Sequence, residues 1–186
     1  MKKIKSTLAN MILSLTIISI LMSFALGFVY IETKEPIDKS QQEKLINAIR
    51  EVLPPFDNDP TKNAIKMEDN LVLYRATNKG KKVGTAVKTY SQKVYSGTII
   101  LMVGFLPNGT IHNISVLDQK ETPGLGSKMT EPTFKDQFKC KNPKEYKLSV
   151  KQDGGDVDAI TASTISSRAF CDAVERAYNA FKKKNQ

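Results

Sequence analysis

An uncharged and mostly apolar stretch opens the chain, running from Ser6 to Ile31 between Lys5 and Glu32. About 20 apolar residues are enough to cross the roughly 30 Å hydrocarbon core of a bilayer, so this pattern predicts one transmembrane helix. A cleaved signal peptide is the alternative, but its apolar core is usually only about 7 to 15 residues long and ends in a small-residue cleavage site. The length of the stretch favours an uncleaved anchor.

The polar segment after the anchor carries a second helical pattern. Glu35-Pro36 marks a helix start, and apolar residues recur at helical spacing from Leu45 to Leu53. Pro54-Pro55 ends this pattern, which predicts a stalk helix of about 15 residues. A turn-rich connector from Pro54 to Asn63 follows.

Strand patterns then alternate with short turns. They cover residues 71–74, 82–90, 97–105 and 110–117. Pro107-Asn108-Gly109 is a strong hairpin signal between the last two, because Asn-Gly tolerates the positive φ angles of a tight turn. Neighbouring strands joined by short turns predict an antiparallel sheet.

The last third of the chain mixes loops and helices. A Gly-rich loop from Glu121 to Lys128 precedes a short helix near residues 131–138 and a strand near residues 146–150. Asp153-Gly154-Gly155-Asp156 is typical of a turn. Apolar residues then recur every four positions from Ile165 to Phe181, which predicts a long amphipathic C-terminal helix.

These elements predict an α+β fold without internal repeats. It has a single N-terminal transmembrane helix, then one small domain whose antiparallel sheet is flanked by helices and a long C-terminal helix. We expect three regions: a cytoplasmic tip and transmembrane anchor over residues 1–31, a stalk helix and connector over 32–63, and the folded domain over 64–186. At 186 residues, the chain has room for one ordinary domain.

The distribution of charged residues predicts how the anchor is oriented in the membrane. Lys plus Arg number 28 against 19 Asp plus Glu, a formal net charge of +9, and Lys2, Lys3 and Lys5 precede the span. The positive-inside bias therefore predicts a cytoplasmic N-terminus and an extracytoplasmic domain. The remaining excess (9 − 3 = +6) lies in lysine-rich turns and helix ends without interleaved aromatic residues, so we expect no nucleic-acid partner.

Few residues are suited to metal or nucleophilic chemistry. His112 is the only histidine, and it lies in a strand pattern where a surface position is expected. Cys140 and Cys171 are the only cysteines, and no Cys-x-x-Cys pair occurs. In an oxidising compartment they could form one disulfide, but the sequence alone leaves this open. We predict no metal site and no histidine-dependent catalytic triad.

Five hydroxyl residues crowd the start of the C-terminal helix, between Asp158 and Arg168. They are Thr161, Ser163, Thr164, Ser166 and Ser167. A helix start needs one of them as a cap, because a side-chain oxygen there accepts an otherwise unpaired backbone N–H. A helix start with free N–H groups and small side chains is also a ready phosphate site, and the residues alone leave both interpretations open.

The same stretch resembles the flavinylation motif of the FMN-binding domain family, Asp-x-x-[Ser/Thr]-Gly-Ala-Thr-x-[Ser/Thr]-Ser. Asp158 matches the acid, Thr161 the first hydroxyl, and Thr164 the threonine that carries FMN through its phosphate. Ser166-Ser167 matches the trailing pair, while Ala162-Ser163 replaces Gly-Ala with other small residues.

A second motif lies upstream. Residues 121–126, Glu-Thr-Pro-Gly-Leu-Gly, are similar to a loop of the same sequence in that family. Taken alone the segment is only a Pro-Gly turn, but two motifs in the family's order, with Tyr95-Ser96-Gly97 ahead of them, are hard to obtain by chance. The resemblance extends from the anchor to the C-terminus and makes residues 64–186 an expected FMN-binding domain.

The resemblance implies FMN attached covalently to Thr164, with the phosphate at the helix start and the ring at the upstream loop. The implied cofactor-binding residues are Thr161, Ser163, Thr164, Ser166, Ser167, Ser96, Gly97, Glu121, Thr122, Gly124, Leu125 and Gly126. Backbone N–H groups from Gly124 to Gly126 are expected to bond the polar edge of the ring, and Leu125 to pack on its face. Glu121 is expected either to bond a ring N–H or a ribityl hydroxyl, or to be an exposed loop residue.

A threonine hydroxyl is a weak nucleophile and no base adjoins Thr164, so a separate transferase is implied. The resemblance implies that this is a Mg²⁺-dependent flavin transferase outside the cytoplasm. Within the family, one anchor, a short stalk and one small domain resemble the G subunits of Rnf-type ion-translocating electron transport complexes. The C subunits of Na⁺-pumping NADH:quinone oxidoreductases share the motifs in a usually longer chain and are the alternative.

The resemblance therefore implies an electron-relaying subunit rather than a stand-alone enzyme. We expect a single-pass protein of the inner (cytoplasmic) membrane with its flavin domain on the periplasmic side and other redox subunits as partners. Ion pumping would belong to polytopic partners, because the span contains no acidic residue. An anchored protein that binds a phosphorylated ligand reversibly, and an assembly scaffold with a degenerate motif, stay open as alternatives.

Overall fold

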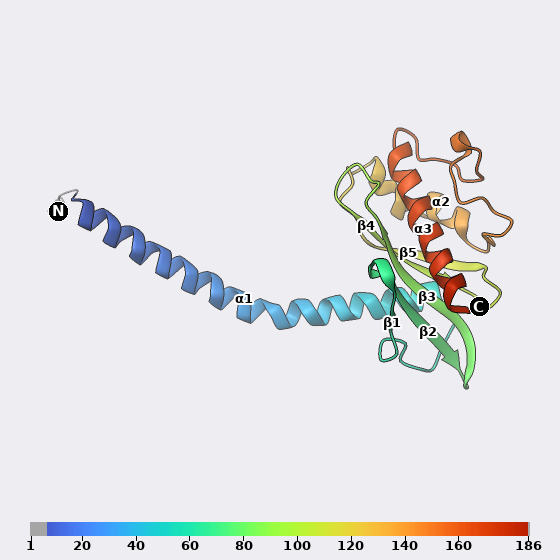
Figure 1. Ribbon diagram of the computed structural model, residues 1–186, viewed down its shortest axis with the longest axis horizontal. Coiled ribbons are helices and arrows are strands. Elements are labelled where there is room, and N and C mark those ends of the chain that lie inside the picture. Colours follow the sequence, from blue (N-terminus) through green and yellow to red (C-terminus); the bar gives the residue numbers. More distant parts are fainter. Residues whose placement is uncertain (1–6, 186) are drawn as a thin grey trace. The chain divides into compact units, whose positions relative to one another are not determined.

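The computed structural model describes residues 7–185, in two compact units with a boundary between Glu43 and Lys44. The first unit holds most of helix α1 (Leu8–Val52), and the second holds all the remaining elements (Figure 1). α1 is the one helix of the described chain that is long and apolar enough to cross a membrane, with a mean hydropathy of 2.4 in its most apolar window. None of that window is buried within the protein.

The polar part of the first unit continues α1 and does not start a new helix. The sequence predicted a start at Glu35-Pro36, but α1 stays helical through Pro36. Proline removes one backbone N–H, here the donor to the Glu32 carbonyl, at a typical cost of about 3 kcal/mol, and it kinks or interrupts a helix only locally. An ion pair one turn apart, between Glu35 and Lys39 at 2.6 Å, spans the position. The helix ends at Val52, just before the two prolines predicted to stop it.

Five antiparallel strands in the order β1-β2-β3-β4-β5 form the sheet of the second unit. They are β1 (Ile65–Lys66), β2 (Val72–Asn78), β3 (Lys81–Ser91), β4 (Ile99–Phe105) and β5 (Ile111–Asp118). Each strand pairs with its neighbour in the sequence, as Thr85 does with Phe105 across β3 and β4. Short connections allow only antiparallel neighbours, so the predicted α+β class and antiparallel sheet are confirmed.

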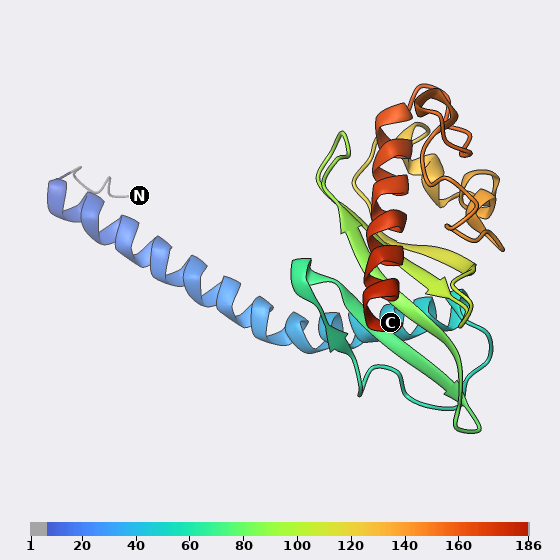
Figure 2. The ribbon, with the colours of Figure 1, turned by 45° about the vertical axis from the view of Figure 1, so that its right-hand side comes forward.

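Helices cover both faces of this sheet. α3 (Thr164–Asn185) lies across one face, packed on β3 and β4 (Figure 2). The larger core fills this interface and includes the fully buried rings of Phe105 and Phe170. The end of α1, residues 44–52, packs on the other face through a smaller core that includes Ile49.

Polar contacts also fix the end of α1 to the sheet. Asn113 Nδ2 donates to the Glu51 carbonyl at 3.1 Å, and Nδ1 of His112 lies 3.1 Å from the Val52 carbonyl oxygen. The Glu51 carboxylate pairs with Lys135 Nζ at 3.1 Å. The last carbonyls of a helix have no partner within it, and this explains why His112 is a partly buried strand residue rather than the surface residue predicted.

Short helical turns lie along the chain between the sheet and α3. They are η2 (Gly126–Thr130), α2 (Pro132–Lys135), η3 (Asp136–Phe138) and η4 (Lys151–Asp153), while η1 (Glu68–Asn70) precedes β2. The strand predicted near residues 146–150 is wrong, because in the described chain this segment forms a single bridge, between Val150 and Val157. Its backbone bonds to the loop that follows it, for example from the Val157 N–H to the Ser149 carbonyl at 3.0 Å, and so does not join the sheet.

Both cysteines are free thiols, so the disulfide that the sequence left open is not formed. Cys140 is exposed after η3, whereas Cys171 is buried within α3. Burial raises the pKa of the Cys171 thiol to about 12. The thiol is therefore protonated at neutral pH and serves as a small apolar residue of the core.

Candidate functional site

Two segments that are far apart in the sequence line one cavity of about 640 Å³. They are the loop after β5 and the start of α3, and Tyr95 joins them from the connection between β3 and β4. The lining residues are Tyr95, Glu121, Thr122, Leu125, Gly126, Ala162, Ser163, Thr164, Ile165 and Ser166. The volume falls within the range of roughly 300 to 1,000 Å³ that small-molecule sites have.

Glu121 ties the loop after β5 to the chain that follows β3. Its side chain is only 7% exposed, and its Oε1 atom accepts a hydrogen bond from the Tyr95 N–H at 3.0 Å. A Cβ atom on Gly126 would lie 2.7 Å from both Glu121 Oε2 and Ser166 Oγ, so only glycine fits between the two segments. Of the two expectations for Glu121, the exposed position is therefore wrong.

The turn in this loop uses two of the backbone donors expected to face a ring. The Gly124 N–H donates to Ser127 Oγ at 2.9 Å, and the Leu125 N–H donates to the Thr122 carbonyl at 3.1 Å. Gly124 has a φ of +77°, a left-handed conformation that glycine adopts without a Cβ clash. Gly126 begins η2. The first N–H groups of a helix have no partner within the helix, so the Gly126 N–H stays available to a ligand.

The hydroxyl residues in the first turn of α3 have two different roles: one stabilises the fold, and two line the cavity. Ser167 is fully buried, and its Oγ accepts from the Ile160 N–H at 2.9 Å and donates to the Ser163 carbonyl at 3.0 Å. In the described chain, the hydroxyls of Thr164 and Ser166 have no hydrogen-bond partner, and both residues line the cavity. Thr164 is the first residue of α3, so it stands at the positive end of the helix dipole.

Ala162 approaches this turn in a left-handed conformation, with a φ of +61°. Such a conformation costs a residue with a Cβ atom roughly 1 to 2 kcal/mol, whereas glycine adopts it freely. Ala162 occupies the position at which the flavinylation motif has glycine. This chain therefore takes a conformation that suits glycine with an alanine at position 162.

Gln137, which lies outside both motifs, holds the loop before α3. Its Oε1 atom accepts from the Asp158 N–H at 2.7 Å, and its Nε2 atom donates to the Asp158 carbonyl at 3.2 Å. The Asp158 carboxylate pairs with Lys151 Nζ at 2.8 Å and does not line the cavity. Gln137 and Ser167 thus fix the backbone of the motif from two sides.

Three large apolar side chains are exposed in the described part of the second unit, and all three line the cavity. They are Tyr95 (77% exposed), Leu125 (42%) and Ile165 (51%). Apolar surface gathered in one place on an otherwise polar domain marks a binding site, because exposure there does not help the fold.

The structure brings together part of the predicted set of cofactor-binding residues. Glu121, Thr122, Leu125, Gly126, Ser163, Thr164 and Ser166 line the cavity. Ser96, Gly97, Gly124, Thr161 and Ser167 do not. Thr161 lines a neighbouring cleft instead, and Ser167 belongs to the core.

Sequence reasoning missed Tyr95, Ile165, Ala162 and Gln137. Tyr95 carried a usable signal, since it directly precedes Ser96 in a segment that the resemblance singled out. Ile165 was assigned to the buried stripe of the C-terminal helix, but it is exposed at the first turn. Gln137 carried no signal, because its partner is the backbone of Asp158.

Comparisons with known proteins agree with this geometry. The FMN-binding domain family matches residues 95–179, which include both segments that line the cavity. The chain is 31% identical over 180 residues to the G subunit of the ion-translocating oxidoreductase complex of Shewanella oneidensis, covering 89% of this chain and 85% of that protein. The chain belongs to this family of G subunits.

The chain is also similar to two further proteins. The G subunit of the ion-translocating oxidoreductase complex of Shewanella baltica is 31% identical over 161 residues, which cover 78% of this chain and 76% of that protein. The crystal structure of Shewanella oneidensis NqrC is 25% identical and covers 69% of this chain and 62% of that chain, with a TM-score of 0.46. In this member of the G-subunit family, the match to the FMN-binding domain begins at Tyr95, the residue whose N–H is held by Glu121.

Proposed function

We propose that this protein is a membrane-anchored flavoprotein subunit that carries FMN covalently on Thr164 and relays electrons between other subunits of an ion-translocating oxidoreductase complex. One observation carries the proposal: the Glu121–Gly126 loop and the start of α3 line the same cavity. Membership of the G-subunit family and the FMN-binding domain over residues 95–179 support it.

The residues of the cavity fit FMN. Tyr95, Leu125 and Ile165 offer exposed apolar surface to a flat ring system, and the first N–H groups of α3 suit a phosphate. Gly126 lets the loop and the helix approach without a side chain between them. When bound, FMN supplies one-electron and two-electron redox chemistry, and the protein orients it and sets the polarity around it.

Attachment uses Thr164 as the nucleophile. Its Oγ atom forms a bond to the FMN phosphorus of FAD, the pyrophosphate bond of FAD breaks, and AMP leaves. Of the two carboxylates in the motifs, Asp158 pairs with Lys151 and does not line the cavity, and Glu121 holds the Tyr95 N–H through Oε1 while its Oε2 lies beside Gly126. We therefore assign removal of the hydroxyl proton to a separate Mg²⁺-dependent flavin transferase, because a threonine hydroxyl needs a base to act as a nucleophile.

Exposure favours Thr164 over the other hydroxyls of the motif. Ser163 and Ser166 are buried, and Ser167 is buried with its hydroxyl fully engaged. Thr164 is only partly buried, so its hydroxyl is accessible to a transferase. Thr161 is exposed as well, but it lines a different cleft.

The N-terminal anchor determines where we place the protein in the cell. α1 is long and apolar enough to cross a membrane, and the three lysines before the span favour a cytoplasmic N-terminus. We place residues 1–31 as the cytoplasmic tip and anchor, 32–63 as the stalk and connector, and 64–186 as the flavin domain on the periplasmic side of the inner membrane. Ion movement is left to other subunits, because the span offers no acidic residue to an ion.

Mass and fluorescence of the denatured protein test the proposal. The full-length chain is co-expressed with a flavin transferase, and the denatured product is examined by in-gel flavin fluorescence and intact mass. We expect one FMN per chain in the wild type, none in Thr164→Ala, partial labelling in Thr164→Ser, and full labelling in Ser163→Ala. Flavin that leaves the wild type on denaturation would instead support reversible binding of a phosphorylated ligand, and label that persists in Thr164→Ala would assign another acceptor.

A further inference from the structure

We propose that Tyr95 is the aromatic wall against which the flavin ring lies, and that Asp172 is a positioning residue that holds the Tyr95 segment in place. The inference rests on the proposed function, because it takes FMN on Thr164 as the ligand. Neither residue belongs to the two sequence motifs.

The backbone of Tyr95 is fixed while its ring is not covered. The Tyr95 N–H is bonded to the buried Glu121 carboxylate, and Val94 before it packs against the larger core. The side chain of Tyr95 is nevertheless 77% exposed and lines the cavity. Large aromatic side chains usually bury most of their surface, so a ring held open on a fixed backbone indicates a surface that a ligand covers.

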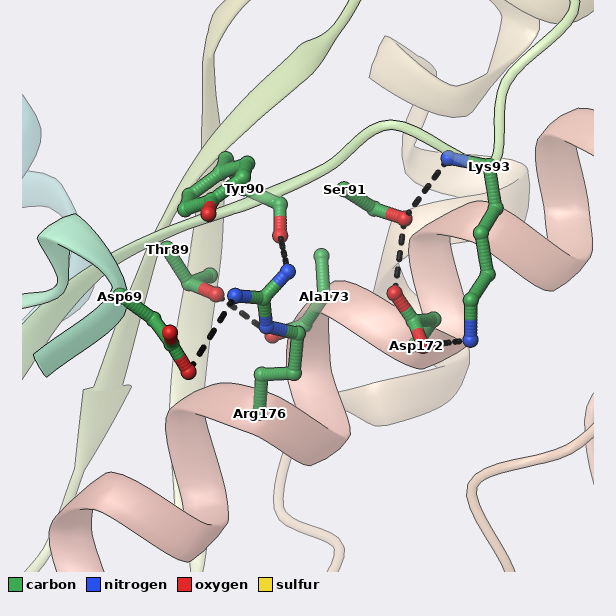
Figure 3. A network of polar contacts seen from close by, with 8 residues as sticks. All are labelled: Asp69, Thr89, Tyr90, Ser91, Lys93, Asp172, Ala173 and Arg176. Carbon is green, nitrogen blue, oxygen red and sulfur yellow. Dashed lines mark hydrogen bonds and ion pairs between the residues drawn. The ribbon is translucent and has the colours of Figure 1, made fainter.

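Asp172 fixes the same segment from α3. Its Oδ2 atom accepts a hydrogen bond from Ser91 Oγ at 2.7 Å, and its Oδ1 atom pairs with Lys93 Nζ at 2.5 Å (Figure 3). Ser91 Oγ in turn accepts from the Lys93 N–H at 3.3 Å. These contacts close a small ring of bonds over Ser91 to Lys93, and the Glu121 contact at Tyr95 fixes the segment a second time.

The two acceptor residues of the cluster are shielded from water, while the Lys93 side chain is 72% exposed. Ser91 is fully buried and the Asp172 side chain is 19% exposed. Partial burial opposes ionisation of Asp172, but the hydrogen bonds from Lys93 and Ser91 outweigh it and hold the pKa of this carboxyl below its ordinary value. Hydrogen bonds to a charged carboxylate are stronger than those between neutral groups, so Asp172 restrains the segment firmly.

Arg176, one turn further along α3, makes contacts that do not involve the Tyr95 segment. Its Nη1 atom donates to the Tyr90 carbonyl at 3.3 Å, and its guanidinium lies 4.3 Å from the centre of the Tyr90 ring (Figure 3). Its Nη2 atom lies 3.9 Å from the Asp69 carboxylate. Arg176 therefore ties α3 to β3 and η1, and it provides a matched control for Asp172.

Contact between a phenol ring and a flavin ring has a spectroscopic signature. The phenol passes an electron to the light-excited flavin and receives it back, which quenches fluorescence without net chemistry. The rate of this transfer falls steeply as the distance between the two rings grows. Fluorescence per bound FMN therefore reports where Tyr95 lies, independently of how stable the domain is.

The test uses the full-length chain, purified in detergent after co-expression with a flavin transferase, with FMN occupancy measured by intact mass. We expect Tyr95→Leu to raise the fluorescence yield per bound FMN several-fold and Tyr95→Trp to keep it low. Asp172→Ala should raise it to an intermediate value, because the segment is still held by Glu121. Arg176→Met should leave it at the wild-type value even where the melting temperature falls.

Three results would overturn the inference or its basis. An unchanged yield in Tyr95→Leu at full occupancy would remove Tyr95 from the flavin. Equal yields in Asp172→Ala and Arg176→Met would remove the specific positioning role of Asp172. Absence of covalent FMN from the wild-type chain would instead contradict the proposed function, and with it the ligand on which this inference rests.

Discussion

Gly104 and Gly126 are both packed so closely that a methyl group would not fit, yet their neighbours differ in kind. A Cβ atom on Gly104, in β4, would overlap the backbone carbonyl of Val52 at the end of α1. A Cβ atom on Gly126 would lie 2.7 Å from two side-chain ends, Glu121 Oε2 and Ser166 Oγ, and 2.9 Å from Glu121 Cβ. The ends of side chains can turn aside, whereas a backbone carbonyl cannot. The face under α1 is thus built for one arrangement, while the cavity is bounded by groups that can adjust to a ligand.

Two glutamates show the same contrast. Both oxygens of Glu51, at the end of α1, have partners within the protein: Ser115 Oγ at 2.7 Å and Lys135 Nζ at 3.1 Å. Glu121 uses Oε1 for the Tyr95 N–H, and its Oε2 faces Gly126 at the cavity. Glu51 thus has both oxygens paired within the protein, although its side chain is 44% exposed. The cavity keeps polar groups with capacity to bind, and this distinguishes a candidate site from a structural contact.

Gly104→Ala should give the largest effect. We expect a loss of about 3 kcal/mol or more in the free energy of unfolding, the upper end for overpacking, because β4 and the end of α1 must separate. Thermal or chemical unfolding of the full-length chain, followed by circular dichroism, measures it. Gly124→Ala is the control: its Cβ would meet open space, so only the left-handed φ is penalised, by about 1 kcal/mol. Equal losses in the two variants would contradict the contrast between the two regions.

Gly126→Ala should separate stability from flavin content. The added methyl group displaces the Glu121 carboxylate and the Ser166 hydroxyl, which costs about 1 to 3 kcal/mol as a typical overpacked site does. The same shift narrows the cavity, so the fraction of folded chains that carry covalent FMN should drop. Intact mass of the folded fraction gives this number. A variant that keeps full FMN occupancy would show that the close approach serves the fold only.

Gln137→Ala should slow flavin attachment with a small loss of stability, about 1 kcal/mol for the lost hydrogen bonds. The loop from Asp158 to Ser163 loses one of its two restraints, so Thr164 is presented less often in the right position. A time course of FMN incorporation by a purified flavin transferase and FAD, read by intact mass, measures the rate. Gln152→Ala, a change at an exposed position in η4, should incorporate FMN at the wild-type rate. Identical time courses for the two variants would remove the role of Gln137.

Ala162→Gly should have the smallest effect and the opposite sign. Glycine relieves the left-handed conformation at this position, and the gain is offset in part by the greater freedom of glycine in the unfolded chain. We expect a rise of up to about 1 kcal/mol in the free energy of unfolding, with FMN attachment retained. A measured loss of stability would show that the backbone at residue 162 does not take the left-handed path.

Local patterns in the sequence correctly predicted most of the sheet and the C-terminal helix. Alternating apolar residues and the Asn108-Gly109 turn are short-range signals, and β3, β4 and β5 follow them closely. The false strand at residues 146–150 failed because pairing partners are chosen in three dimensions, and this segment bonds to the loop after it. The helix start predicted at Glu35-Pro36 is wrong because the helix on either side of Pro36 tolerates one missing backbone N–H.

The candidate site was less accessible to sequence reasoning. The family resemblance supplied its two motifs, but the grouping of Glu121, Gly126 and Ser166 around one cavity depends on how the loop and α3 pack. Gln137 acts on the backbone groups of Asp158, and such a contact leaves no mark in residue types. Physical contacts of this kind become visible only in the folded chain.

Peptide mapping of the flavin tests the central claim most directly. Trypsin should release residues 152–168 between Lys151 and Arg168, a peptide that contains all five hydroxyls of the motif. We predict that this peptide carries the flavin fluorescence of the denatured wild-type protein, and that its fragment ions place one FMN phosphoester on Thr164. An FMN increment on Thr161, Ser163, Ser166 or Ser167, or on any other peptide, would contradict the account.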